Sequence, residues 1–207
     1  MPTSDIQDLF GLHPSSDKLA SHLASLASLT SLSQAPAPEV KSYPDAVYLN
    51  YFPVGLSFLF KPINGYKPKL GLKLGELKYE DLVLDGVDLY NTPKPKPGAP
   101  ASQTKPSHSK YPVNPFILNL VPIPDKTRSE SLSITPNTTG KEFVEALGEP
   151  DRKGGGAGPS SGSIGIWCEW SKDGIMIEFG GEESKGPKAW ETGKDAVWKV
   201  ITVFPPK

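Results

Sequence analysis

Apolar residues recur at helical spacing in two stretches of the chain. The first begins after residues 14–17 and ends before the Ala-Pro repeat of residues 35–38. The second is residues 141–148, KEFVEALG, where Thr139 and Glu142 have the spacing of a capping box. The stripe of the first helix is formed by Leu19, Leu23 and Leu26. Each pattern predicts an amphipathic helix with one face toward a core.

Alternation of apolar and polar residues predicts antiparallel strands after each helix. In the first half it predicts a hairpin over residues 47–60, with its turn at residues 53–55, and a third strand over residues 82–90. In the second half it predicts a hairpin over residues 164–179, turning at Asp173-Gly174, and a last strand over residues 197–204. Both halves therefore read as a helix followed by a small antiparallel sheet.

The two hairpins align without gaps. Residues 48–60 match residues 167–179, so that Tyr48 falls on Trp167, Gly55 on Gly174 and Phe60 on Phe179. We therefore predict an α+β fold of two similar units, a duplicated arrangement. The first unit is residues 1–91, a Pro-rich linker with an extended segment is residues 92–131, and the second unit is residues 132–207.

Two connections are predicted to be open to proteases. Residues 93–110 and residues 152–162 lack apolar anchors and are rich in Gly, Pro, Ser and Lys. The second connection includes the glycines of GEPDRKGGGAGPSSG, which follow a helix and lead into a strand. A phosphate-binding loop needs the opposite order, with a lysine and a Ser or Thr at fixed spacing, so we expect a plain connection here.

A capped helix ending in ALGEP, a glycine-rich loop, a W-x-x-W strand and a DG hairpin resemble the small outer-membrane-assembly lipoproteins of the SmpA/OmlA kind. Two such units in one chain resemble the β-lactamase inhibitor protein. The resemblance covers residues 139–204 best and residues 6–90 more loosely. It implies helices on antiparallel sheets and a role in binding proteins. The chain departs from both families, because it lacks a lipoprotein signal and the paired cysteines of the secreted inhibitor.

The composition and net charge of the chain limit the classes of partner that it is expected to bind. The net charge is −1, with 22 basic and 23 acidic residues, so no overall field favours nucleic acid or an anionic membrane. The N-terminus has no secretory pattern, and no stretch has the length of a membrane span. With a single cysteine, Cys168, these features predict a cytoplasmic protein. We expect neither a nucleic-acid nor a membrane partner.

The side chains that could bind a metal or take part in catalysis are scattered along the sequence. The three histidines, His13, His22 and His108, have no metal-ligand spacing, and Cys168 falls on the predicted helix-facing row as a buried, inert thiol. The sequence thus predicts no metal, no cofactor and no catalytic set, and it leaves an enzyme as the third choice.

The second face of the predicted sheets is aromatic, although the free face of an open antiparallel sheet is usually polar. Either other parts of the chain cover this face, or it binds a partner. The function we predict is a non-enzymatic protein-interaction module, with a protein partner or a homodimer contact; the alternative is a small apolar ligand held between sheets and helices. The predicted binding residues are Trp167, Met176, Trp198, Phe204, Tyr48, Leu59 and Tyr90.

Overall fold

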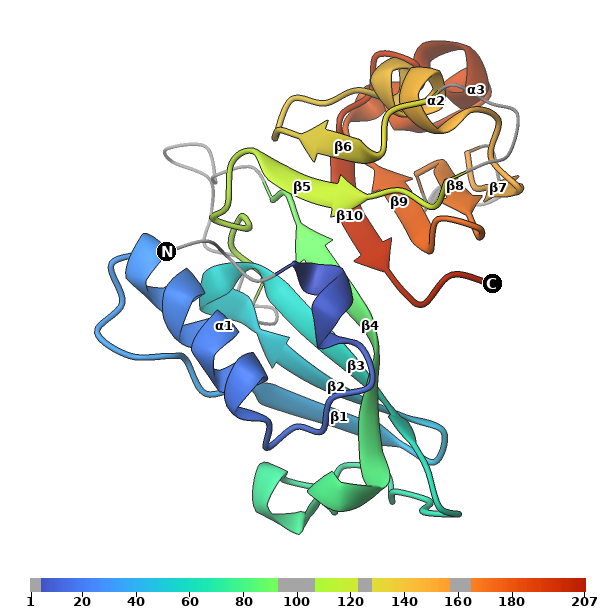
Figure 1. Ribbon diagram of the computed structural model, residues 1–207. Helices are drawn as coiled ribbons and strands as arrows, with labels where there is room; N and C mark the ends of the chain where they lie inside the picture. Colours follow the sequence, from blue (N-terminus) through green and yellow to red (C-terminus); the bar gives the residue numbers. More distant parts are fainter. Residues whose placement is uncertain (1–4, 93–106, 123–127, 157–164) are drawn as a thin grey trace. The chain divides into compact units, whose positions relative to one another are not determined.

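The protein has a mixed α+β fold of helices and antiparallel sheets (Figure 1), as the sequence predicts. The computed structural model describes residues 5–92, 107–122, 128–156 and 165–207. The chain divides into two compact units, residues 1–113 and residues 114–207.

The first unit begins with a short 3-10 helix, η1 (Ile6–Leu9), and the helix α1 (Asp17–Leu29). The side chain of Ser16 accepts a hydrogen bond from the amide of Lys18 and so caps the start of α1. The buried residues of α1 include the predicted leucine stripe and His22. The helix predicted in this region is therefore confirmed.

Four strands follow α1 and pair in chain order. The sequence did not predict β1, whereas the hairpin of β2 and β3 and the third predicted strand, β4, are confirmed. The turn between β2 and β3 contains η2 (Phe52–Val54), and the loop between β3 and β4 contains η3 (Leu74–Glu76) and η4 (Tyr79–Asp81). The strands are β1 (Glu39–Tyr43), β2 (Ala46–Tyr51), β3 (Leu56–Pro62) and β4 (Leu82–Tyr90).

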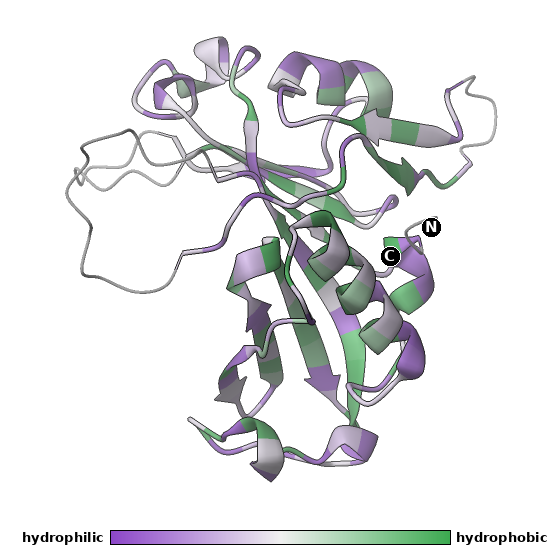
Figure 2. Cartoon of the chain, turned by 90° about the vertical axis from the view of Figure 1, so that its left-hand side faces the viewer, coloured by the Kyte–Doolittle hydropathy of each residue, from purple (hydrophilic) through white to green (hydrophobic). Residues whose placement is uncertain are grey.

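The two faces of this sheet differ in character. Leu49 lies opposite Phe58 and Phe58 opposite Val87, and all three are buried on the face that α1 covers. Both views show α1 lying along this face (Figures 1 and 2). On the other face Asn50 lies opposite Ser57, and Ser57 lies opposite Asp88. We call this second face of β1–β4 the outer face of the first sheet.

The second unit begins with a two-stranded hairpin, followed by a helix and a four-stranded sheet in the order β10-β9-β8-β7. The amide of Thr139 donates to the carboxylate of Glu142 over 2.7 Å, so the predicted capping box is confirmed. The elements are β5 (Phe116–Asn119), β6 (Ser131–Ile134), α2 (Gly140–Leu147), β7 (Arg152–Gly154), β8 (Trp167–Trp170), β9 (Ile175–Phe179), η5 (Glu182–Ser184), α3 (Ala189–Thr192) and β10 (Trp198–Val203).

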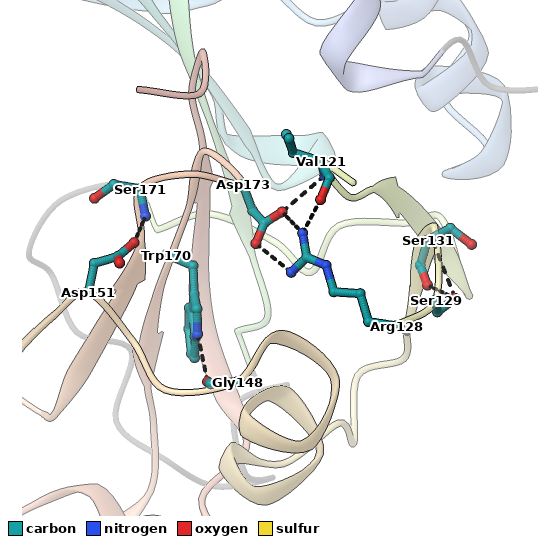
Figure 3. Close-up of polar contacts among 9 residues, drawn as sticks. All are labelled: Val121, Arg128, Ser129, Ser131, Gly148, Asp151, Trp170, Ser171 and Asp173. Atoms are coloured by element: carbon teal, nitrogen blue, oxygen red, sulfur yellow. Dashed lines mark hydrogen bonds and ion pairs between the residues drawn. The ribbon is translucent and has the colours of Figure 1, made fainter. Parts of the chain in front are cut away.

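The core of the second unit lies between α2, the β5–β6 hairpin and one face of the sheet. Phe143 of α2 contacts Phe179 of β9 with ring centres 6.2 Å apart. Trp170 of β8 donates from Nε1 to the carbonyl oxygen of Gly148, just after α2 (Figure 3). Cys168 is buried on the same face as Trp170, as predicted, and burial raises the pKa of its thiol to about 11.

A buried ion pair holds the turn between β8 and β9. Arg128 contacts both carboxylate oxygens of Asp173, and Asp173 also accepts from the amide of Val121 over 3.0 Å (Figure 3). The guanidinium donates in addition to the carbonyl oxygen of Val121. Only 3% of the Asp173 side chain and 12% of the Arg128 side chain are exposed, so this pair ties the turn to the segments around β5 and β6.

The structure corrects two of the sequence predictions, both about short segments. The predicted open connection over residues 152–162 is wrong for Arg152–Gly154, because these residues pair with β8 as strand β7. Gly155 and Gly156 are described, whereas residues 157–162 lie outside the described residues. Of the other predicted open connection, residues 93–106 also lie outside them, and in the described part, residues 107–110, the amide of Ser109 donates to the carbonyl oxygen of Phe52 over 2.8 Å. The hairpin between β8 and β9 has a longer turn than the predicted two residues, because it spans residues 171–174 between the two strands.

Candidate functional site

A cavity of about 450 Å³ opens on the outer face of the first sheet. It is lined from β1 and the following turn by Lys41, Tyr43 and Asp45, from β2 by Ala46, Tyr48 and Asn50, from β3 by Ser57, and from β4 by Asp88 and Tyr90. Polar and aromatic side chains thus make up nearly all of its wall. The cavity belongs to the first unit alone.

The floor of the cavity is a pair of buried, neutral polar side chains. Ser57 donates to the side-chain oxygen of Asn50 over 2.9 Å, and Asn50 donates to the carbonyl oxygen of Glu39 over 3.2 Å. Only 1% of Ser57 and 6% of Asn50 are exposed. Because a buried polar group without a partner is costly, these bonds hold both side chains in place and make the floor rigid.

Three tyrosines form the walls. The rings of Tyr43 and Tyr48 meet edge to face with centres 6.2 Å apart. The ring of Tyr90 stacks in parallel on the imidazole of His108, 3.6 Å away, and His108 also contacts Phe52 at 4.5 Å. One face of Tyr90 is therefore covered by His108, which holds this ring in a set orientation.

The described lining of the cavity contains charged side chains of both signs. The lining includes two carboxylates, Asp45 and Asp88, and one cation, Lys41. The Nζ atom of Lys41 lies 3.7 Å from the Oε1 atom of a third carboxylate, that of Glu39. Burial raises the pKa of Tyr48 above its usual value, and the nearby Asp88, Tyr43 and Asp45 raise it further. Burial and the charge of Lys41 lower the pKa of His108 to about 4, which leaves it neutral near pH 7.

The structure brings together some of the predicted binding residues in the first unit. Tyr48 and Tyr90 both line the cavity. Leu59 lies opposite Tyr48 on the same face, where its side chain packs over Gly86, but it is not part of the lining. All three are partly exposed.

The second sheet has a corresponding outer face, turned away from α2. Trp167 lies opposite Glu178, and Met176 lies opposite both Glu169 and Thr202, so Trp167 and Met176 share this face. Phe204 follows β10, and alternation from Thr202 places it on the same face. These three predicted residues are partly exposed.

Trp198 does not lie on this outer face, and its predicted place beside Trp167 is wrong. A bulge leaves Lys199 as an extra residue in β10, so Trp198 lies opposite Phe179 on the core face. Its ring contacts Phe116 edge to face at 5.8 Å, and its Nε1 donates to the carbonyl oxygen of Thr135 over 2.8 Å. With 2% of its surface exposed, Trp198 is a core residue.

An arginine of the second unit lies against its outer face. The guanidinium of Arg152 is 5.9 Å from the ring centre of Trp167 and 3.1 Å from the carboxylate of Glu169. Glu169 is 6% exposed and also accepts from the hydroxyl of Ser171 over 2.7 Å. Trp167 covers Gly154 so closely that a Cβ atom there would stand 2.7 Å from its ring.

Sequence reasoning missed most of the cavity. Tyr43 and Lys41 belong to β1, which was not predicted, and Asn50 and Ser57 did not stand out because they are single polar residues within apolar strands. The alternation in EVKSY, residues 39–43, is the signal that reveals β1.

Within the described parts of the chain, no group of three or more His, Cys, Asp or Glu side chains is placed to hold a metal ion. Among the same residues, no helix combines the length and apolar character needed to cross a membrane. Comparisons of the chain with protein-family models, curated proteins and solved structures found no significant match.

Proposed function

We propose that this chain is a non-enzymatic protein-interaction module whose contact surface is the outer face of the first sheet. The observation that carries this proposal is the open cavity on that face, with Tyr43, Tyr48 and Tyr90 in its wall. Tyrosines of this kind, partly exposed and held by their neighbours, are typical of the residues that contribute most to protein interfaces.

The fixed positions of the side chains in the cavity suit the binding of a partner better than catalysis. The buried Asn50–Ser57 pair and the Tyr90–His108 stack fix the floor and one wall, so little conformational entropy is lost when a partner docks. The titratable side chains of the lining are two carboxylates, one lysine and three tyrosines, a set that suits recognition of a partner's surface. An enzyme of unknown class remains a third candidate.

The alternative of a small apolar ligand has one specific observation in its favour. A second cavity, of about 160 Å³, lies between α1 and the sheet and is lined mainly by apolar side chains, including Leu19, Leu23, Phe58 and Phe60. Its volume is below the roughly 300–1,000 Å³ typical of ligand pockets. We therefore favour the interaction surface.

We also propose that the two units are copies of one element, a helix followed by four strands in chain order. Matching registers support this: Tyr51 lies opposite Leu56 as Trp170 lies opposite Ile175. Each last strand also has a bulge of one residue, at Asp85 and at Lys199.

The hairpin glycines support the same proposal. Gly55 and Gly174 have positive φ angles of 60° and 67°. The carbonyl oxygen of Gly55 accepts from the amide of Tyr90 over 3.0 Å, and that of Gly174 accepts from the amide of Phe204 over 2.8 Å. Such a duplication also agrees with the tandem arrangement that the sequence resemblance implies.

Affinity capture tests the interaction proposal. The wild-type chain, Tyr48→Ala and a control, Trp190→Ala, are immobilised, and the proteins retained from a cell extract are quantified by mass spectrometry. Trp190 is 47% exposed and lies in the other unit, so it controls for loss of an exposed aromatic ring. We expect a set of proteins to be lost with Tyr48→Ala and kept with Trp190→Ala.

Sedimentation of the same three chains tests the homodimer form of the proposal. A dimer that dissociates in Tyr48→Ala and persists in Trp190→Ala identifies a second copy of this chain as the partner. If Tyr48→Ala changes neither the captured proteins nor the oligomeric state while it remains folded, the interaction proposal is wrong.

A further inference from the structure

We propose that the loop between β3 and β4, residues 63–81, docks the protein on the surface of an anionic lipid bilayer through residues 67–73, which we call the loop tip. The loop lies at the end of the first sheet where β3 ends and β4 begins (Figure 1). This inference goes beyond the proposed function, because it concerns another surface of the first unit and does not use the cavity.

Leu70 projects into water from the loop tip. Its exposed fraction is 75%, more than that of any other large apolar residue in the described parts of the chain. At Gly71, the next residue, nothing lies within 4 Å of the place where a Cβ atom would stand. The turn therefore extends beyond its surroundings and presents a leucine at its surface.

The turn that carries Leu70 is fixed by a buried hydroxyl group of β1. Ser42, which is 1% exposed, donates to the carbonyl oxygen of Lys69 over 2.7 Å and accepts from the amide of Leu72 over 2.7 Å. Both sides of the turn are thus bonded to one side chain. Because the leucine is already held outward, little conformational entropy is lost when this surface binds.

The loop is rich in leucine, although the connections between strands are usually polar. Besides Leu70 it contains Leu72, Leu74 and Leu77, and each of these three is partly exposed. None of the four leucines of the loop is buried. Apolar side chains gathered on a surface in this way mark an interaction site.

Basic residues flank Leu70 on both sides. Lys67, Lys69 and Lys73 are exposed, and no Asp or Glu occurs between residues 64 and 75. The whole loop has four lysines and three acids, whereas the loop tip has three lysines and no acid. The positive charge of the loop is therefore concentrated around the exposed leucine.

The ammonium groups of the loop tip are not paired with acids of the first unit. Among the described residues, none of the ion pairs includes Lys67, Lys69 or Lys73. Residues 1–4 and 93–106, which are the parts of the first unit outside the described ranges, contain no Asp or Glu. Every acid of the first unit is thus described, and the three lysines are available to an anionic partner.

A bilayer surface fits the loop tip better than an acidic protein does. Lysine is depleted at protein interfaces, whereas lysines beside exposed apolar residues are typical of segments that lie on anionic membranes. The ammonium groups can contact lipid phosphates while Leu70 enters the boundary of the acyl chains. The net charge of the whole chain, −1, gave no reason to expect a membrane partner, but the loop tip gives one.

The test is cosedimentation of the full chain with lipid vesicles. One vesicle type is phosphatidylcholine alone, and the other is an equal mixture of phosphatidylcholine and the anionic phosphatidylserine. We expect the chain to sediment with the mixed vesicles and not with the neutral ones. Because the attraction is electrostatic, added salt is expected to release it.

Replacing the lysines tests the charge of the loop tip. The triple variant Lys67→Gln, Lys69→Gln, Lys73→Gln is expected to lower the partition coefficient about a hundredfold, which is about fivefold per lysine. The matched control has the same net charge but replaces three exposed lysines of the second unit, and it is expected to bind about as well as the wild type. It consists of Lys172→Gln, Lys188→Gln and Lys194→Gln.

Replacing the leucine tests its entry into the bilayer. Leu70→Ser is expected to lower the partition coefficient about tenfold. The control Leu29→Ser, at a leucine of α1 that is 56% exposed, is expected to have no effect. Leu70→Cys can be labelled with an environment-sensitive fluorophore because the natural Cys168 is buried, and we expect its emission to shift to the blue on mixed vesicles.

Four results would overturn the proposal. The first is equal binding to both vesicle types, or none. The second is an equal loss in the two triple variants, and the third is unchanged binding of Leu70→Ser with no spectral shift of the label. The fourth is a polyglutamate peptide that binds as tightly as the mixed vesicles and independently of Leu70, which would assign the loop tip to an acidic protein. Tyr48→Ala is expected to keep vesicle binding, so the proposed function of the cavity is tested separately.

Discussion

The indole nitrogen of Trp198 donates a hydrogen bond of 2.8 Å to the carbonyl oxygen of Thr135. This bond links β10 to the residue that follows β6, and it belongs to the core of the second unit. Trp167, which the sequence places beside Trp198, lies on the opposite face of the same sheet. The two tryptophans therefore have different roles and should respond differently to truncation.

Trp198→Ala is expected to lower the free energy of unfolding by about 3–5 kcal/mol, because it opens a cavity in the core and removes one of the two hydrogen bonds that the Thr135 carbonyl accepts, the other coming from the amide of Thr138. Trp167→Ala is expected to cost about 1–2 kcal/mol, as its ring is partly exposed. Urea unfolding of the two variants checks the difference. Equal losses would contradict the assignment of Trp198 to the core and Trp167 to the outer face.

Gly55→Ala is expected to destabilise the first unit far more than Gly65→Ala. Both glycines have positive φ, 60° and 76°, so both variants have the backbone cost of about 1–2 kcal/mol. A Cβ atom at Gly55 would also collide with the backbone of Ser109 and lie 2.6 Å from the amide nitrogen of Tyr111, whereas nothing lies within 4 Å at Gly65.

Thermal melting of Gly55→Ala and Gly65→Ala measures this difference directly. The gap between the two variants reports the close approach of the segment containing Ser109 and Tyr111 to the β2–β3 turn. Similar melting temperatures would show that this segment does not pack against the turn in solution.

Asp173→Ala is expected to cost about 3–5 kcal/mol, because it leaves the Arg128 guanidinium buried without its carboxylate and the Val121 amide without an acceptor. The control is Lys141→Ala, which removes an exposed pair with Glu145 whose two side chains are 65% and 63% exposed. That change is expected to cost less than about 0.5 kcal/mol. Denaturant unfolding of both variants gives the comparison, and a small loss in Asp173→Ala would mean that the turn is held by other contacts.

His22 is expected to make stability depend on pH. Its imidazole is 1% exposed, and neither ring nitrogen has a hydrogen-bond partner in the described structure. Burial lowers its pKa from 6.5 to about 4. Between these values the unfolded chain takes up a proton that the folded chain excludes, so stability is full above about pH 6.5 and falls by about 3 kcal/mol as the pH drops to about 4.

The variant His22→Leu isolates this contribution. It replaces two unpaired nitrogens by an apolar side chain, so we expect it to be more stable than the wild type near pH 7 by about 1 kcal/mol or more. Its unfolding free energy should also change less between pH 6.5 and pH 4. A variant with the same pH dependence as the wild type would assign that dependence to other groups, such as His108, whose pKa is shifted in the same direction.

The local sequence pattern was sufficient to predict the elements whose alternation or capping residues are pronounced. Alternation and capping residues predicted β4 over its whole length, the β2–β3 hairpin with its glycine, and the α2 capping box of Thr139 and Glu142. These features depend on residues close together in the chain, because caps, turns and strand faces are decided within a few residues. The same alternation correctly placed Cys168 on the buried face of β8.

The sequence by itself thus determined the α+β class, the main strands and the aromatic character of the outer face, including Tyr48 and Tyr90. Only the tertiary structure decided which side chains meet there. The short strands β1 and β7 are held by their pairing partners, and the bulge at Lys199 exists because β10 is matched against β9. Strand pairing joins residues distant in sequence, so neither the cavity wall nor the side of Trp198 follows from local alternation.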